Sequence, residues 1–516
     1  MTNLGRSVAV IAAAGAITAT ALAAPTAQAT PTTHAHHHDS GLILTSPRRH
    51  LTVHIYGSGK QQWVDFNAGV YLKSAKHAFE FDVSRRHAKD MIRVVARAGD
   101  RTWRIPNRYL RGWAGLRKAL VLTWRKPDGA LIGRNRMNLC LNDYDEARLR
   151  PDAATNSAYT WGCGGNPFTR GQRWGIDRGW ARSITPYGSI PGRLITTDTV
   201  LLDISLRRDL ARALGMTVAQ STVRFHARVK HTDDGEGDAV SLERRVSPSA
   251  LGNRSATADQ AHPTEPADVD ARSARVPRHT LPDLIALPAW GISTHHEGKH
   301  DLLDFAATVY NGGRGPLVAE GFRKGSKPVM RAYQFFYRGG RQVGSARVGT
   351  MKYDSRPSHQ HWHFEDFAVY DLVKKKHKHA HALRTSGKEA FCLAPTDGID
   401  LLVPGAPANP GNGDLSTACG DLSSIWVREV LANGWGDTYT QDRAGQSIDI
   451  TTLPNGTYWI RVRANPGHRL YEARTTNNTS FRRVILGGTP GARTVRVPKY
   501  GRIDSERGLD VGGGED

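Results

Sequence analysis

Short runs of β-branched and aromatic residues, each bounded by glycine, proline or asparagine, recur along most of this sequence. Residues 200–206, 366–373 and 457–465 are examples. Runs of this length and composition predict β-strands, and their spacing predicts antiparallel, sandwich-like domains. Only residues 207–215 are typical of a helix, which we expect to end at Gly215. The sequence therefore predicts a mostly β protein.

The length of 516 residues exceeds what one hydrophobic core normally fills, so we expect two β-sandwich-like domains. The opening residues are small and apolar and lead to Ala27-Gln28-Ala29, which is typical of a cleaved secretory signal. No later apolar run is long enough to span a membrane, which predicts a secreted, extracellular protein without a transmembrane segment. The expected order is a signal peptide (1–29), a disordered His-rich segment (30–41), a first β-rich domain (42–231), a linker (232–278), a second β domain (279–487) and a C-terminal tail (488–516).

The formal net charge of +22 favours contact with anionic polymers such as those of a cell wall. A basic surface that only keeps the protein soluble explains the charge equally well. The sequence has no zinc-finger spacing, aromatic RNA-binding signature or recognition-helix pattern, so we expect no sequence-specific binding of nucleic acid.

The four cysteines fall into two similarly spaced pairs, and a Gly-Trp dipeptide follows each pair. This similarity indicates a diverged internal duplication. An exported protein meets an oxidising environment, in which four cysteines can form two disulfides. Of the three pairings that four cysteines allow, the simplest joins Cys140 to Cys163 and Cys392 to Cys419.

Three histidines alternate along an expected strand, with Gln360 and Trp362 between them. Side chains alternate across a strand, so the three imidazoles should project from one face. Three such nitrogens suit Cu(II), Zn(II) or Fe(II). We therefore predict a metal site at His359, His361 and His363.

Other readings of these histidines remain open. Three histidines and a water also describe a catalytic zinc. His359, His361 and Glu365 fit the first metal motif of cupin dioxygenases, although no second histidine motif follows convincingly. Chance clustering is a further alternative, because other histidines gather among lysines at 377–381.

The stretch 358-SHQHWHFEDFAVYDL-372 closely resembles the copper-binding signature of lysyl oxidases. Three further segments, 387–393, 437–451 and 458–478, resemble lysyl oxidase segments in the same order. The resemblance covers about 281–487 and identifies the second domain as lysyl oxidase-like.

The resemblance implies that His359, His361 and His363 bind copper(II), and that Lys388 and Tyr439 are joined into lysine tyrosylquinone. It implies a secreted, protein-lysine 6-oxidase-like copper amine oxidase. Such an enzyme uses dioxygen to oxidise peptidyl lysine or other small primary amines to aldehydes, releasing ammonia and hydrogen peroxide. The first domain has no comparable histidine motif, so we expect it to be non-catalytic. The alternative is a non-catalytic protein that binds the cell wall or matrix and carries a structural metal.

The catalytic base is less well specified. Where animal lysyl oxidases have a histidine before Tyr-Asp-Leu, this chain has Val369, which leaves Asp366 and Asp371 as candidates. Asp366 follows His363 by three positions, so a regular strand would turn it away from the histidines.

The resemblance also implies a calcium site. Its oxygen donors would be Asp283, Leu284 through its carbonyl, Glu472, Asn477 and Asn478. The family aspartate expected among them is replaced by Arg474, whose guanidinium could take the place of the cation.

Overall fold

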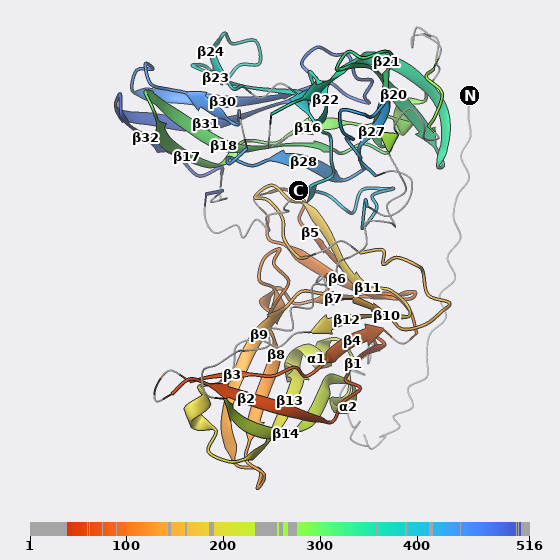
Figure 1. The fold of residues 1–516 in the computed structure, drawn as a ribbon, viewed down its shortest axis with the longest axis vertical. Coiled ribbons are helices and arrows are strands. Elements are labelled where there is room, and N and C mark those ends of the chain that lie inside the picture. The colour runs from red at the N-terminus through yellow and green to blue at the C-terminus, as the bar shows by residue number, and fades with distance from the viewer. Residues whose placement is uncertain are drawn as a thin grey trace, which may run out of the picture. The chain divides into compact units, whose positions relative to one another are not determined.

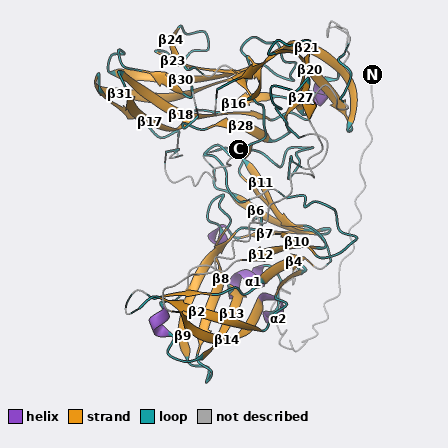
Figure 2. Cartoon of the chain, in the orientation of Figure 1, coloured by secondary structure: helices purple, strands orange, loops and turns teal. Residues whose placement is uncertain are grey.

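The computed structural model describes residues 39–232, 255–256, 262–266 and 276–506, except for short gaps (Figure 2). The predicted signal peptide, most of the His-rich segment and most of the linker lie outside the described residues, as do His359 and Lys388. The gaps are at 59, 61, 75, 89, 143–145, 160–161, 185–189, 357–359, 388–389, 412–415, 444, 502 and 504.

The chain is mostly β, as predicted, and the first domain contains three sheets. All strand pairs are antiparallel except the parallel pair of β14 with β2. One sheet has the order β1 (Leu42–Thr45), β4 (Val70–Ser74), β12 (Trp180–Ile184), β10 (Glu146–Arg148). Another has the order β11 (Gly171–Ile176), β5 (Phe79–Ser84), β6 (Arg93–Ala98), β7 (Arg101–Ile105). The largest has the order β3 (Trp63–Asp65), β2 (His50–Tyr56), β14 (Thr222–Thr232), β13 (Thr199–Leu206), β8 (Leu116–Arg125), β9 (Leu131–Leu139).

The second domain also contains three sheets, in which the strands pair antiparallel (Figure 1). A seven-stranded sheet has the order β15 (Ser255–Ala256), β27 (Trp426–Leu431), β19 (Leu317–Arg323), β20 (Val329–Arg338), β21 (Arg341–Asp354), β22 (His361–Glu365), β25 (Ala390–Phe391). A second sheet has the order β16 (Leu284–Ala286), β18 (His300–Asn311), β28 (Trp435–Tyr439), β26 (Asp397–Gly398), and β18 also pairs with β17 (Trp290–Glu297) and β29 (Ser447–Asp449). The third has the order β24 (Ala382–Thr385), β23 (Ala368–Val373), β30 (Gly456–Ala464), β31 (Thr479–Thr489), β32 (Ala492–Arg496).

Helices are few and short. The predicted helix forms as α1 (Arg208–Ala213). Gly215 follows it with a φ of +66°, in the left-handed region typical of a glycine that ends a helix. A second helix, α2 (Val218–Ser221), begins with a capping box between Thr217 and Gln220. The described residues also form single-turn 3-10 helices at Asn107–Tyr109, Gly192–Leu194 and Arg278–Thr280.

Each domain buries its own apolar core. The first cluster of buried side chains runs in sequence from Leu42 to Ala227, and the second from Leu281 to Leu486. Both predicted disulfides are present, Cys140–Cys163 and Cys392–Cys419, and each lies within one domain. The sheet orders of the halves differ, and the internal duplication stays a prediction. No helix in the described part of the chain is long and apolar enough to cross a membrane.

Two segments are more ordered than the sequence suggested. Within the expected C-terminal tail, β32 pairs with β31, because 492–496 alternates exposed and half-buried residues after a glycine turn. Within the expected linker, Glu265 accepts hydrogen bonds from Arg331 (2.6 Å) and from the Tyr333 hydroxyl (3.0 Å). These contacts anchor a segment whose composition is typical of a flexible connection.

Candidate active site

The histidine strand is shorter than predicted. β22 begins only at His361, because Gln360 has a φ of +45°, which interrupts the extended backbone. The regular strand expected over 359–363 is therefore interrupted at Gln360. His361 and His363 do share one face, with ring centroids 4.6 Å apart.

The imidazoles of His361 and His363 converge, since their Nε2 atoms lie 2.9 Å apart. Nitrogen ligands about 2.0 Å from one metal ion lie roughly 3 Å apart, so this spacing fits a shared metal. His363 is buried, and its Nδ1 lies 3.6 Å from the carboxylate of Asp354. A carboxylate at Nδ1 orients a ligating imidazole and leaves Nε2 for the metal.

The described residues alone do not complete a metal site. Among them, no group of three or more His, Cys, Asp or Glu side chains could hold an ion, and His359 is not described. Glu365, which the cupin alternative requires, is bound to Lys352 Nζ (2.6 Å) and Thr350 Oγ1 (2.5 Å). Glu365 is therefore already engaged by neighbouring side chains, which weighs against the cupin alternative.

Tyr439 ends β28 and packs against the strand next to the histidines. Its hydroxyl donates to the carbonyl oxygen of Cys392 (3.3 Å), and its ring meets Phe391 edge to face with centroids 4.8 Å apart. Phe391 pairs with Phe364 of β22. Burial, together with Asp437, raises the pKa of Tyr439 well above its ordinary value. The phenol is therefore neutral. Its contact with Phe391 and the pairing of β25 with β22 link it to the strand that carries His361 and His363.

Two further aromatic rings enclose this region. Tyr370 meets Phe391 and Phe305 edge to face, with centroids 6.0 Å and 5.8 Å apart. Tyr370, Phe391 and Phe305 are almost fully buried, so they separate the site from water.

Two buried carboxyl groups that sequence reasoning missed face the same core. Glu429 alternates with Val427 and Leu431, two residues of the core cluster, and is fully buried. Its Oε2 accepts from the backbone N–H of Leu393 (3.0 Å), while its Oε1 has no partner among the described residues. Burial raises the pKa of Glu429 well above the ordinary value, and Asp437 adds to the shift. An acidic residue inside the apolar run 426–431 was the available signal.

Asp437 lies two residues before Tyr439 on β28 and pairs with the core residue Val309. Alternation along the strand puts Asp437 on the face that Tyr439 occupies. Only 3% of Asp437 is exposed, so its carboxyl belongs to the interior of the site.

The two predicted bases lie elsewhere. Asp371 faces away from the core that holds its neighbour Tyr370, and it accepts two hydrogen bonds from Arg461, both 2.7 Å, and one from Arg463, 2.9 Å. Asp366 has a φ of +61°, is exposed, and lies 3.3 Å from Arg469. Asp437 and Glu429, in contrast, both contribute to the raised pKa of Tyr439.

Gly387, which precedes Lys388 in the sequence, lies close to Gly445. A Cβ built on Gly387 would lie 3.7 Å from the Cα of Gly445, so the two backbones approach closely. The next residue, Gln446, is fully buried, and neither atom of its amide has a hydrogen-bond partner in the described structure.

The predicted calcium ligands do gather. Asp283 binds Arg474 (2.8 Å) and Asn477 Nδ2 (2.9 Å), so the guanidinium meets the carboxylate, as the sequence suggested. Glu472 accepts from Asn478 Nδ2 (2.7 Å) and from the backbone N–H of Leu284 (3.1 Å). The Oδ1 atoms of both asparagines are buried and have no hydrogen-bond partner among the described residues, which suits oxygen donors to a cation.

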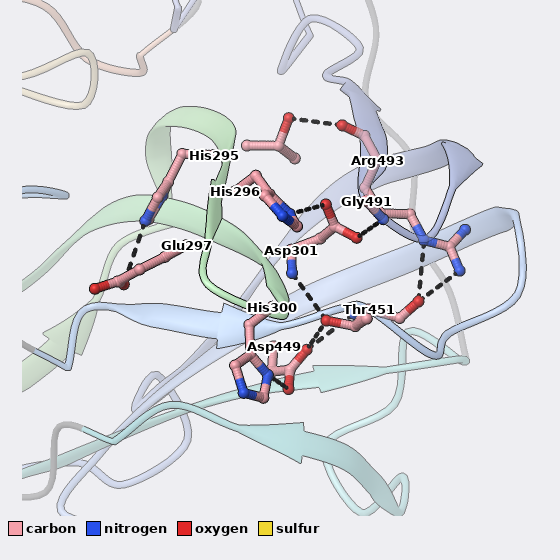
Figure 3. Close-up of polar contacts among 10 residues, drawn as sticks. His295, His296, Glu297, His300, Asp301, Asp449, Thr451, Gly491 and Arg493 are labelled. Atoms are coloured by element: carbon pink, nitrogen blue, oxygen red, sulfur yellow. Dashed lines mark hydrogen bonds and ion pairs between the residues drawn. The ribbon is translucent and has the colours of Figure 1, made fainter.

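A different group of histidines lies on the β17–β18 hairpin (Figure 3). His295 lies 2.6 Å from Asp304 and 3.8 Å from Glu297, His296 pairs with Asp301 (3.1 Å), and His300 pairs with Asp449 (2.8 Å). The hydrogen bond to Asp304 raises the pKa of His295. These are separate histidine–carboxylate pairs, not a cluster that converges on one point.

A hollow of about 420 Å³ opens beside this hairpin and the segment that follows Tyr439. Its lining includes Glu297, Asp304, Asp442 and Arg443. The three carboxylates outnumber the two basic groups of the lining, Arg443 and His295, although the chain as a whole is strongly basic. Such a local excess of negative charge attracts cations.

The lysyl oxidase family model matches residues 324–492, which include β22, β25 and β28. A comparison with curated proteins gave no match. The first domain lies outside the matched residues.

Proposed function

We propose that the domain matched by the lysyl oxidase family model at 324–492 is a copper-dependent amine oxidase. Its substrate would be a primary amine, either peptidyl lysine or a small molecule. The amine, dioxygen and water would give an aldehyde, ammonia and hydrogen peroxide. The observation that carries the proposal is the link from the paired imidazoles of His361 and His363, through β22 and β25, to the buried ring of Tyr439.

Copper(II) and a quinone formed from Lys388 and Tyr439 are the proposed cofactors. Copper would supply electron transfer with dioxygen, and the quinone would supply an electrophilic carbonyl that accepts the amine. His361 and His363 would hold the copper together with His359, while Asp354 fixes the ring of His363.

The aromatic residues around Tyr439 would keep water out and hold its ring in one plane. We propose Asp437 as the group that takes the proton from the substrate α-carbon, because it lies on the same face of β28 as Tyr439. Glu429, whose pKa is raised, would stay protonated and donate rather than accept. Asp366 and Asp371 are held by arginines and are weaker candidates.

The carboxylates around the hollow support a cationic substrate. An ammonium group would be attracted to Glu297, Asp304 and Asp442, which counters the repulsion expected from the net positive charge. The paired cysteines support an oxidising, extracellular location.

The proposal is tested by loading the chain with Cu(II) in air and mapping its peptides for a cross-link between Lys388 and Tyr439. We expect the cross-link in the wild type and its absence in Lys388→Arg and Tyr439→Phe, both of which should still bind copper. Tyr500→Phe, at an exposed ring, is the matched control. Unmodified Lys388 and Tyr439 in folded, copper-loaded wild type would exclude amine oxidation.

One observation favours a separate binding role for the first domain. The outer face of its six-stranded sheet carries six cations and two carboxylates, since register places Arg224, Arg228 and Lys230 of β14 beside β2 and β13. The remaining members of this basic face are Arg125, Arg134, Arg136, Asp65 and Asp203. We propose that the basic face retains the protein on an anionic cell-wall polymer. This is the alternative function if the second domain proves inactive.

A further inference from the structure

Gln446 and Gln334 are both fully buried glutamines of the second domain, but only one of them is satisfied. Gln334 donates to the carbonyl of Tyr471 (2.9 Å) and accepts from its N–H (2.8 Å). Neither Nε2 nor Oε1 of Gln446 has a partner in the described structure. Burying an amide without hydrogen bonds is costly, so Gln446 needs a partner that the described residues do not supply.

The strand register shows where Gln446 lies. Both β28 and β29 pair with β18. Tyr439 of β28 lies opposite Ala307, and Ser447 of β29 lies opposite Asp304. Continuing the second register by one residue puts Gln446 opposite position 305. Gln446 and Tyr439 are then two positions apart along β18, which corresponds to roughly 7 Å between their backbones.

The same register also fixes the face. Ile448 of β29 pairs with Leu303 and belongs to the buried core, and Gln446 precedes it by two residues. Residues two apart along an extended segment point the same way, so Gln446 faces the core. Tyr439 packs against that core as well. The two side chains are therefore neighbours on one face of one sheet edge.

From this arrangement we infer that Gln446 is a positioning residue for the quinone: its amide would bind polar atoms that appear on the Tyr439 ring when the ring is oxidised and joined to Lys388. The inference rests on the proposed function. It does not make Gln446 a catalytic group, since it would hold the ring and exchange no proton.

The chemistry of the amide matches the atoms that would be created. Forming the quinone consumes two dioxygen molecules. One atom of the first molecule is added to the ring and its other atom leaves as water. The second molecule leaves as hydrogen peroxide. The ring thereby gains an oxygen, which accepts hydrogen bonds, and a linking N–H from the lysine, which donates. A glutamine amide offers one donor group and one acceptor group, so a single side chain can satisfy both.

The test compares Gln446→Met with Gln334→Met, two substitutions that remove a buried amide and keep a similar volume. In copper-free protein we expect Gln334→Met to lower the melting temperature, because two hydrogen bonds are lost. Gln446→Met should leave it unchanged or raise it, because no hydrogen bond is lost. After loading with copper in air, Gln446→Met should form the Lys388–Tyr439 cross-link about tenfold more slowly and show a shifted visible absorption band.

Gln446→Glu provides a second, polar variant that keeps the acceptor and removes the donor. Its absorption band should move differently from that of Gln446→Met. A Gln446→Met protein that is destabilised like Gln334→Met before loading would overturn the inference, and so would wild-type cross-linking rate and absorption. If the wild type forms no cross-link, the proposed function itself fails. If the wild type forms the cross-link and Gln446→Met behaves like it, only the inference about Gln446 fails.

Discussion

The hydroxyl of Tyr439 donates to the carbonyl oxygen of Cys392 across 3.3 Å. Cys392 is bonded to Cys419, whose own carbonyl oxygen accepts from the backbone N–H of Trp362 (3.0 Å), between the two described histidines. One disulfide thus connects the backbone that holds the phenol to the strand that carries the imidazoles. Its removal should affect both stability and cofactor formation.

We expect the double substitution Cys392→Ala with Cys419→Ala to lower the free energy of unfolding by about 3 kcal/mol in the chain-entropy model. It should also reduce the yield of the Lys388–Tyr439 cross-link, because the two parts of the site are no longer tied together. Denaturant unfolding and peptide mapping measure the two effects. The matched control is Cys140→Ala with Cys163→Ala, which should cost similar stability and leave the cross-link yield unchanged. Equal yields in both double variants would contradict this role.

Much of this arrangement was accessible from sequence. Strand runs, turn residues and cysteine spacing predicted a mostly β fold and both disulfides, because alternation and loop closure are local properties. The break at Gln360 was not predicted, since a positive φ in a non-glycine residue depends on its tertiary surroundings. Asp371 was predicted as a catalytic base from its place in a sequence motif. Only the strand pairing shows that Arg461 lies opposite it and donates hydrogen bonds to its carboxylate.

Glu429 gives a prediction about pH. Burial raises its pKa in the folded chain above the ordinary value of 4.5, so it favours the folded state fully below that value. This contribution is lost as the pH rises through the folded-state pKa. Gln at this position stays neutral, so Glu429→Gln should remove that fall in stability and be at least as stable as wild type at pH 7. Unfolding free energies measured between pH 4 and about 8 check the slope. A steeper decline in the variant would argue against a neutral Glu429.

The buried Oδ1 atoms of Asn477 and Asn478 support the predicted calcium site, where Arg474 forms an ion pair with Asp283. Arg474→Asp should remove the guanidinium and add an oxygen donor. We expect calcium to raise the melting temperature of this variant by about 5 °C and that of the wild type by less. Arg469→Asp, at an exposed arginine, is the control and should gain nothing. A calcium response in the wild type as large as in Arg474→Asp would show that the guanidinium does not compete.

The basic face of the first domain gives a prediction that does not depend on the amine oxidase. Side chains on alternate positions of a strand share a face, so its cations form one surface. Changing four exposed members to glutamine should weaken binding to purified teichoic acid about tenfold or more, with a smaller dependence on salt. The four are Arg134, Arg136, Arg228 and Lys230. The control makes the same change in charge on the second domain, at Lys375, Lys378, Arg483 and Arg496. Equal weakening by both sets would mean that net charge alone holds the polymer, because a specific face responds only to its own residues.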